Sequence, residues 1–409
     1  MKRRRYLSRQ RRFDRPTVLL AAFLASLAVA RAAEPQAIPI DGAPFAARLA
    51  RADANWRLEF SASAEPRRLA AADLVVWGAF VDPPRGGEIV LADGGLLAAE
   101  LVSLDRDTLT CDGDLVGSRR VPLELVAGVV CHPPLERARH DRLLRQLRSA
   151  DAQADRLILD NGDVVSGSLA SLAEESFAID TPTGPARIEL ARVVAVAFNP
   201  TLASTARPTG LRAMVGFADG SRLMATKLAV GAGKAEIEAA GLGPVRVAAD
   251  RIVALQPFGG RAVYLSDLKI GSFKHIPFLQ LAWPQCERDA NVLGGPLRAG
   301  GKLYLKGLGL HSAARVTYDL DRPYRALQAE LAIDDCAEGH GSVETRVFVD
   351  TGAGGWQPRY ASPVIRGGQA PTSMSVDLVG VKRISLLVEF ADRGDERDEA
   401  DLLNARLVP

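Results

Sequence analysis

The chain has 409 residues, of which 51 are Lys or Arg, 49 are Asp or Glu and four are Cys. Four cysteines are too few to build a disulfide scaffold, and the length predicts two to four domains. The slight positive charge belongs to residues 1–33, because the rest carries 42 basic and 48 acidic residues, a net charge of −6. A net-acidic chain has no overall attraction to nucleic acid or anionic lipid, so we expect no nucleic-acid partner.

Residues 1–33 have the pattern of a signal peptide. Eight Lys or Arg residues precede an apolar run at residues 17–30, and small residues at 28–32 offer cleavage sites. The run has 14 residues, whereas a membrane-spanning helix needs about 20. An uncleaved anchor is the alternative. No second long apolar run follows in the sequence, so we expect an exported protein, periplasmic or extracellular, with no membrane span after signal removal.

Residues 34–85 are predicted to form N-terminal strands. Trp56, Leu58 and Phe60 alternate with charged residues, which is the period of a half-buried strand. These strands are expected to join the first of the units described next or to form a small sheet of their own. Trp56 and Trp77 are assigned to the core, because each lies inside an apolar strand pattern.

Residues 86–257 contain three copies of one pattern. Each copy has an Asp-Gly or Asn-Gly pair and, 33, 32 and 33 residues later, the start of a closing apolar run. The pairs are Asp93-Gly94, Asn161-Gly162 and Asp219-Gly220, and the closing runs begin at Val126, Val193 and Ile252. Such pairs between apolar runs favour two-residue hairpin loops in which both central residues have positive φ. Each copy is therefore predicted to be a meander of four or five short strands.

A meander of this length cannot cover both faces of an open sheet, so closure into a small barrel is expected. The copies look like SH3-like or Sm-like small barrels over residues 86–133, 153–200 and 201–257. No basic stripe with interleaved aromatic residues occurs among them. We therefore expect a spacer or interaction scaffold and not an RNA-binding surface.

Residues 134–152 are predicted to form an inserted helix between the first two copies. Leu143, Leu144 and Leu147 lie three and four positions apart, which is the spacing of one helix face. The helix is expected to pack on a barrel flank, with binding to a partner as the alternative.

The cysteines fall two and two into the halves of the chain, as Cys111 with Cys131 and Cys286 with Cys336. One bridge in each half would suit an oxidising compartment. The alternative is that they are small core residues, and the sequence leaves the choice open.

The last part of the chain is predicted to be a two-sheet antiparallel β-sandwich, because its strands have period two. Val316, Tyr318 and Leu320 alternate with polar residues, and the segment 384–390 alternates in the same way. The fold class expected for the whole chain is therefore all-β, with three small barrel repeats followed by a C-terminal β-sandwich.

Several ordered motifs occur in residues 262–409: Tyr264-Leu265-Ser266-Asp267, Lys306-Gly307, Gly309-Leu310-His311, Ile333-Asp334-Asp335 and Asp398-Glu399-Ala400-Asp401. Together they resemble the NPCBM family, the novel putative carbohydrate-binding module of exported proteins. The resemblance implies a jelly-roll-like sandwich, a glycan partner that contains galactose in some members, and a bound calcium ion. The family usually has Trp where this chain has Leu402, so either a stacking face or a core aromatic is missing.

A sugar site needs an aromatic face for the C–H patch of the ring and planar polar groups for its hydroxyls. The carbohydrate-binding candidates that meet these needs are Trp356, Tyr360, His311, Asp334, Asp335, Glu338 and His340. Trp356 lies in a glycine-rich loop with no strand to bury it, so we expect it to be exposed. His311 has the alternative of bonding the backbone inside the sandwich, and Asp334 and Asp335 have the alternative of capping their own turn.

The acidic segment 392–401 supplies the hard oxygen ligands that calcium prefers. The predicted ligands of a structural calcium ion are Asp392, Asp395, Asp398 and Asp401. The alternative is a surface network in which Arg393, Arg397 and Arg406 pair with these acids.

The sequence favours an exported, non-catalytic carbohydrate-binding protein. One alternative is a structural protein of the cell envelope that binds protein partners without sugar affinity. The other is a glycoside hydrolase whose acids lie among Asp334, Asp335, Glu338 and Glu344. No Gly-x-Ser-x-Gly, His-Glu-x-x-His, Cys-x-x-Cys or phosphate-binding-loop motif occurs in the sequence, so we expect no enzyme.

Overall fold

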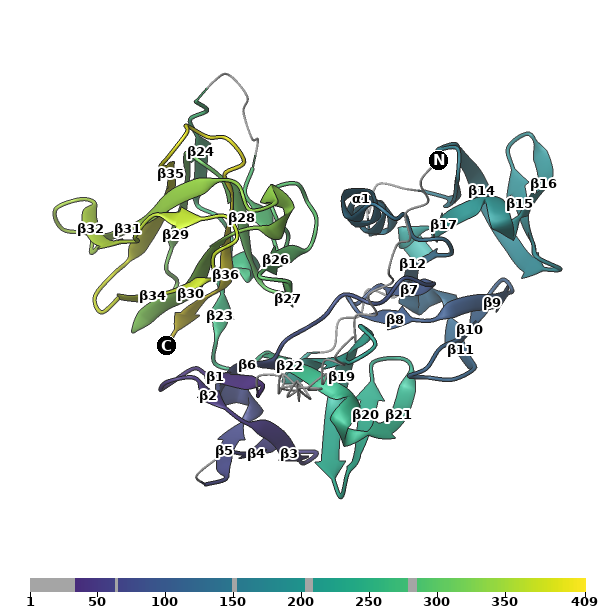
Figure 1. The fold of residues 1–409 in the computed structure, drawn as a ribbon, viewed down its shortest axis with the longest axis horizontal. Helices are drawn as coiled ribbons and strands as arrows, with labels where there is room; N and C mark the ends of the chain where they lie inside the picture. The colour runs from purple at the N-terminus through teal and green to yellow at the C-terminus, as the bar shows by residue number, and fades with distance from the viewer. Residues whose placement is uncertain (1–33, 63–64, 149–152, 203–208, 279–284) are drawn as a thin grey trace, which may run out of the picture. The chain divides into compact units, whose positions relative to one another are not determined.

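A computed structural model describes residues 34–409 apart from 63–64, 149–152, 203–208 and 279–284 (Figure 1). The predicted signal peptide lies outside the described residues. The fold is all-β as predicted, with one α-helix, α1 (Arg137–Leu147), and short 3-10 turns. No helix in the described part of the chain is long and apolar enough to cross a membrane.

Four strand meanders follow one another before the sandwich. The first has β1 (Gln36–Pro39), β2 (Phe45–Ala46), β3 (Arg48–Ala52), β4 (Arg57–Ser61), β5 (Arg67–Ala70) and β6 (Leu74–Gly78); the second has β7 (Glu88–Leu91), β8 (Leu96–Ala98), β9 (Glu100–Leu104), β10 (Thr108–Asp112), β11 (Arg119–Pro122) and β12 (Val126–Val130). The third has β13 (Asp155–Leu159), β14 (Val164–Ala173), β15 (Ser176–Thr181), β16 (Gly184–Glu189) and β17 (Val193–Ala197); the fourth has β18 (Arg212–Phe217), β19 (Arg222–Gly231), β20 (Lys234–Ala239), β21 (Gly243–Ala248) and β22 (Ile252–Phe258).

Each meander has the same order, including the N-terminal one. In all four, a three-residue 3-10 turn precedes the last strand, and that strand pairs antiparallel with the first. Residues 34–85 are therefore a further copy of the repeat and not extra strands of the first barrel. The sequence signal is present, because Asp41-Gly42 stands 33 residues before Leu74.

The three predicted hairpin loops are one residue longer than expected. In the second meander, the Gly94 N–H donates to the Leu91 oxygen at 3.2 Å and the Leu91 N–H donates to the Gly95 oxygen at 3.0 Å. The third and fourth meanders repeat this pattern around Gly162 and Gly220. Only the glycine of each pair has positive φ, whereas a two-residue loop needs it at both positions. The prediction of two-residue loops was wrong; each glycine ends a three-residue loop.

The meanders pair with one another through their closing strands. Strand β12 pairs with β17, and β22 pairs with β6. One hydrophobic core runs through all four, from Trp56 and Trp77 to Phe177 and Leu255. Helix α1 covers the β12–β17 junction, because Leu143, Leu144 and Leu147 are buried against Val90, Val130, Ala195 and Ala197, as predicted for flank packing.

The C-terminal region is a sandwich of two antiparallel sheets, as predicted. One sheet has the order β25-β28-β36-β30-β34 with β23 beside β36, and the other has β24-β29-β35-β31-β32 with β33 beside β31. The strands are β23 (Val263–Tyr264), β24 (Ser272–His275), β25 (Glu287–Arg288), β26 (Leu297–Ala299), β27 (Lys302–Tyr304), β28 (Gly307–His311), β29 (Ala314–Asp319), β30 (Ala326–Ile333), β31 (Ser342–Asp350), β32 (Gln357–Ala361), β33 (Ile365–Arg366), β34 (Thr372–Asp377), β35 (Arg383–Phe390) and β36 (Glu399–Val408).

The structure answers two questions that the sequence left open: the place of Leu402 and the state of the cysteines. Leu402 is 1% exposed in the sandwich core, so the residue that replaces the family Trp packs inside and is not part of a stacking face. All four cysteines are free, which excludes the proposed bridges. Cys111 and Cys286 are buried, as expected for small core residues.

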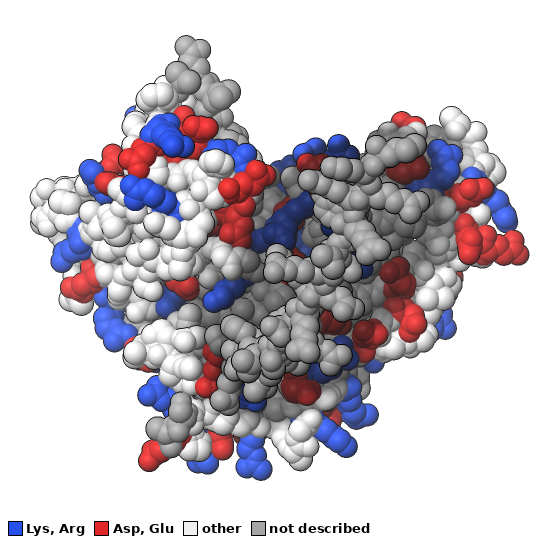
Figure 2. Space-filling view, viewed as in Figure 1, with Lys and Arg blue, Asp and Glu red and all other residues white. Residues whose placement is uncertain are grey.

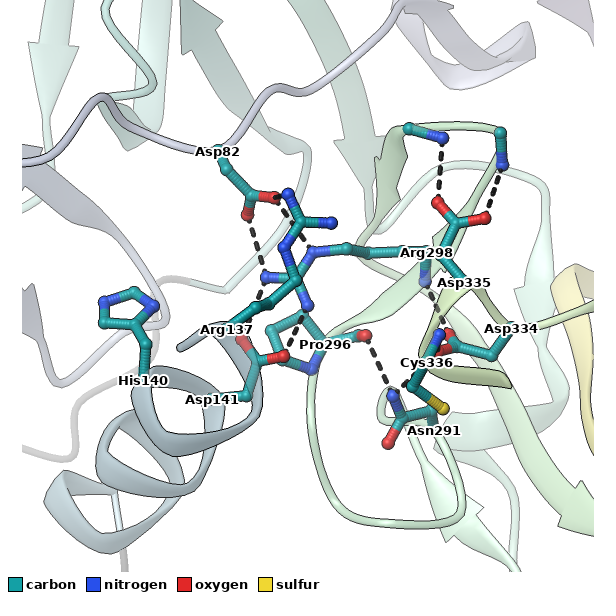
Figure 3. A network of polar contacts seen from close by, with 12 residues as sticks. Asp82, Arg137, His140, Asp141, Asn291, Pro296, Arg298, Asp334, Asp335 and Cys336 are labelled. Atoms are coloured by element: carbon teal, nitrogen blue, oxygen red, sulfur yellow. Dashed lines mark hydrogen bonds and ion pairs between the residues drawn. The ribbon is translucent and has the colours of Figure 1, made fainter. Parts of the chain in front are cut away.

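The sandwich packs on the meanders through an apolar cluster and one buried arginine. The cluster joins Phe80, Met214 and Met224 with Leu303 and Val408. Arg298, 4% exposed, leaves the β26–β27 hairpin. Its guanidinium donates two hydrogen bonds to Asp82, both at 2.9 Å, and two to Asp141, at 2.7 and 2.9 Å (Figure 3).

We predict that Arg298→Ala destabilises the protein by about 3–5 kcal/mol, because its removal leaves Asp141 without its ion pair and Asp82 with only Arg137, 3.9 Å away, at a mostly buried interface. Chemical denaturation of the full chain measures the free energy of unfolding. The control is Arg261→Ala, which removes a half-exposed arginine from its ion pairs with Asp41 and Asp73 and should destabilise the protein much less. Equal effects of the two variants would contradict the prediction.

Candidate functional site

One end of the sandwich brings together loops that are far apart in the sequence. Strands β24, β28, β30 and β35 end there, and β29, β31 and β36 begin there. Asp398 joins three of these loops, because its buried carboxylate accepts the Ser312 hydroxyl at 2.6 Å and the Ser342 N–H at 2.7 Å. Burial raises the pKa of Asp398 from 3.8 to about 6. We call this region the loop end of the sandwich.

His311 lies at the loop end, at the end of β28. It is 8% exposed, and its Nδ1 donates to the Ser312 carbonyl at 2.8 Å. The His275 Nε2 donates to the same carbonyl at 3.0 Å, and the two rings meet edge to face with centroids 6.0 Å apart. The structure thus shows the backbone contact expected as the alternative for His311. Glu338 and His340 are exposed in the neighbouring loop between β30 and β31.

Trp356 lies at the opposite end, in the loop between β31 and β32. Strand β31 runs from Ser342, bonded to Asp398, to Asp350, so nine residues separate the two ends, a distance of roughly 27 Å. Trp356 is 37% exposed, as expected, but the Arg383 guanidinium lies 5.0 Å from its ring centroid. Tyr360 is half-buried in the outer strand β32. The structure therefore does not bring Trp356 and His311 into one site.

Asp334 and Asp335 hold the hairpin that carries Arg298. Asp334 is 2% exposed and accepts hydrogen bonds from the Asn291 amide at 3.0 Å, the Cys336 N–H at 2.8 Å and the Arg298 N–H at 2.8 Å (Figure 3). Asp335 accepts from the N–H groups of Gly300 and Gly301 at 2.9 and 2.8 Å. Backbone and amide donors thus occupy these carboxylates, which is the kind of contact expected in the alternative, structural role of Asp334 and Asp335.

The four predicted calcium ligands have separate surroundings. Asp392 pairs with Arg366 at 2.7 Å, Asp395 accepts the Phe278 N–H at 3.3 Å, and Asp398 joins the loops described above. Asp401 is 1% exposed, and burial together with the charge of Asp334 raises its pKa well above its usual range. Among the described residues, no group of three or more His, Cys, Asp or Glu is placed to hold a metal ion. Calcium binding stays a prediction.

The sequence missed the exposed aromatic residues of the loop end. Phe278 and Phe390 are 54% and 41% exposed, and their rings meet edge to face, with an interplanar angle of 72° and centroids 5.5 Å apart. Ile276, two residues before Phe278 in the sequence, is 58% exposed. Phe390 continues the alternation of a core strand, which hides its exposure in the sequence pattern. The sequence did offer a signal for the exposure of Phe278, because it lies in a short apolar run between two polar stretches.

Residues 261–408, about a third of the chain, match the NPCBM/NEW2 domain family. A putative endo-alpha-N-acetylgalactosaminidase of Renibacterium salmoninarum is 31% identical over 132 residues, 31% of this chain and 8% of that protein. Alpha-1,3-galactosidase B of Akkermansia muciniphila is 31% identical over 120 residues, 28% of this chain and 14% of that protein. The chain thus spans less than a sixth of the length of these curated relatives.

Two solved structures from Clostridium perfringens are also similar. The CBM51 of GH95 in complex with methyl-galactose is 20% identical with a TM-score of 0.31, covering 36% of this chain and 99% of that one. The CBM51-2 and INT domains of ZmpB with GlcNAc are 20% identical with a TM-score of 0.32, covering 46% of this chain and 37% of that one. The domain match over residues 261–408 confirms the resemblance found in the sequence and identifies this part as an NPCBM domain, a carbohydrate-binding module.

Proposed function

We propose that the protein is an exported, non-catalytic carbohydrate-binding protein whose loop end recognises a glycan. The observation that carries the proposal is the pair of exposed rings, Phe278 and Phe390, on a domain of a carbohydrate-binding family. Exposed aromatic rings are the surface on which the C–H face of a sugar packs. Export through the signal peptide of residues 1–33 places the protein in the periplasm or outside the cell.

The polar groups around the rings suit sugar hydroxyls. Asp395 lies beside Phe278, and the Arg366–Asp392 ion pair and the exposed side chains of Glu338 and His340 belong to loops of the same end. Planar carboxylate and guanidinium groups bind pairs of hydroxyls. Both curated relatives are named for galactose or N-acetylgalactosamine, so a galactose-containing glycan is the proposed ligand class.

The contacts of the acids support a binding role more than hydrolysis. Glycoside hydrolysis needs two carboxyl groups that flank the substrate bond. Asp334 and Asp335 are occupied by backbone N–H donors, and Glu344 pairs with Arg346 at 3.3 Å.

In the proposal, the four meanders are SH3-like or Sm-like small barrels that form a scaffold for the sandwich, since the last strand of each pairs with its first.

We predict that Phe278→Ala and Phe390→Ala each weaken glycan binding about five- to tenfold, because each removes an aromatic contact with the sugar. A glycan array of the full chain, with and without a calcium chelator, selects the ligand, and calorimetry measures its dissociation constant. Trp356→Ala is the matched control and should bind as the wild type does, because it lies at the other end.

Binding lost in Trp356→Ala but kept in the phenylalanine variants would move the site to the opposite end of the sandwich. A flat array would reject the proposal and favour a protein partner for the exposed rings. Binding that the chelator abolishes would show the predicted calcium ion.

Asp398 gives the loop end a pH dependence that can be measured. Its pKa is raised from 3.8 to about 6, so the folded protein holds this proton more tightly than the unfolded chain does. As pH rises from about 4 to about 6, the unfolded chain loses the proton first, and stability falls. We predict that the thermal midpoint of the wild type falls relative to that of Asp398→Asn across this window and then runs parallel above it. Parallel curves throughout would contradict the shift.

A further inference from the structure

A cavity of about 650 Å³ lies between the fourth meander, helix α1 and the sandwich. This volume is within the range of small-molecule sites, about 300–1,000 Å³. Six positively charged side chains line it: Arg145, Arg148, Arg212, Arg222, Arg288 and Lys306. Figure 2 shows Lys and Arg side chains in a hollow of the viewed face, next to acidic ones.

The acids of the cavity wall neutralise only one of these six charges, that of Lys306. Asp141 pairs with Arg298 outside the lining, and Asp93 accepts the Gly95 N–H of its own turn at 2.8 Å. The other two, Asp267 and Asp289, both pair with Lys306, at 2.5 and 2.8 Å. Within the described residues, the remaining arginines of the wall form no ion pair with an acid.

Arg222 is the most deeply buried of these unpaired arginines: it is 6% exposed and lines the cavity. Its side chain has neither a hydrogen bond nor an ion pair with any residue that the structure describes. Of the nearby acids, Asp82 binds Arg298 at 2.9 Å, and Glu88 contacts His140 at 3.0 Å through one oxygen only. Burial and the charge of Arg148 lower the pKa of Arg222 to about 9, so it remains charged at neutral pH. A buried guanidinium without acceptors is unfavourable unless a bound anion supplies them.

The rest of the wall is apolar. Met214 and Met224 are buried members of the apolar cluster beneath the cavity, and Phe258 stands beside them. The Lys306 ammonium lies 5.9 Å from the Phe258 ring centroid. A small inorganic ion would leave these surfaces uncovered, whereas an organic body would contact them.

We infer that the cavity binds a small organic molecule that carries a carboxylate, a sulfate ester or a phosphate ester. Arg148 and Arg222 bind the anionic group, because their charges lie close enough to repel each other and both face the cavity. Phe258 and the two methionines contact the body of the ligand. The inference is independent of the glycan site at the loop end, which shares none of these residues.

The test titrates the full chain with glucuronate, galactose 6-sulfate and galactose 6-phosphate, with galactose and inorganic sulfate as reference ligands. The variants are Arg148→Gln and Arg222→Gln, and the matched control is Arg187→Gln, an exposed arginine on β16. At least one anionic sugar should raise the thermal midpoint of the wild type and of Arg187→Gln. Its affinity should be tenfold or more weaker in both cavity variants and should fall as salt rises.

Without ligand, Arg222→Gln should melt at or above the wild-type temperature, because the variant lacks the uncompensated charge; this keeps the binding result separate from misfolding. Arg148 is exposed, so Arg148→Gln gives a second measurement of ligand affinity in a variant whose folding should be unaffected. The inference is overturned if no anionic sugar binds at millimolar concentration, if both cavity variants bind as the wild type does, or if inorganic sulfate binds as tightly as the sugars. Failure of the phenylalanine variants to affect glycan binding would leave this result unchanged.

Discussion

The buried guanidinium of Arg298 is the constraint on which the arrangement of residues 34–409 depends. A charge that is 4% exposed needs compensation, and two carboxylates from different segments supply it: Asp82 after the first meander and Asp141 in α1. Asp334 fixes the Arg298 backbone, and Asp335 fixes the turn of the same hairpin. The guanidinium is thus held from both sides, which ties the sandwich to the meanders by directional contacts as well as by apolar area.

The loop between β30 and β31 connects this interface with the proposed glycan site. Its first residues, Asp334 and Asp335, hold the hairpin, and its last residues, Glu338 and His340, are exposed at the loop end. A rigid first half restricts the conformations of the second half, because the loop spans only eight residues between the two strands. Preorganised polar groups lose less entropy when a ligand binds. In the proposed site, the docking of the sandwich would therefore restrict Glu338 and His340 without contacting the ligand.

More of the fold than of the candidate site could be predicted from the sequence. Period-two alternation and the ordered motifs were sufficient for the sandwich, and the turn-to-strand spacing was sufficient for three meanders; the copy that begins at Asp41-Gly42 has the same spacing and was missed. The arrangement of the candidate site residues could not be predicted, for a different reason. Local composition predicts that the Trp356 loop is exposed, but the end of the sandwich at which a loop lies depends on strand pairing, and so does the burial of Asp334. Phe278 and Phe390 meet only because β24 and β35 both flank β29.

Strand β36 shows why the acidic closing motif does not behave as a surface loop. All ten of its residues are buried, although Glu399, Asp401, Asn404 and Arg406 are polar. The side chains of Ala400, Leu402, Ala405 and Leu407 face the sandwich core, while Leu403 packs with Leu297 and Ala299 of the hairpin. Asn404 accepts a hydrogen bond from Gln256 of β22 at 3.2 Å. The strand is covered on its outer face by the β26–β27 hairpin around Leu403 and by β22 around Asn404. Its carboxyl groups therefore lose water, and burial favours the protonated form of Asp401.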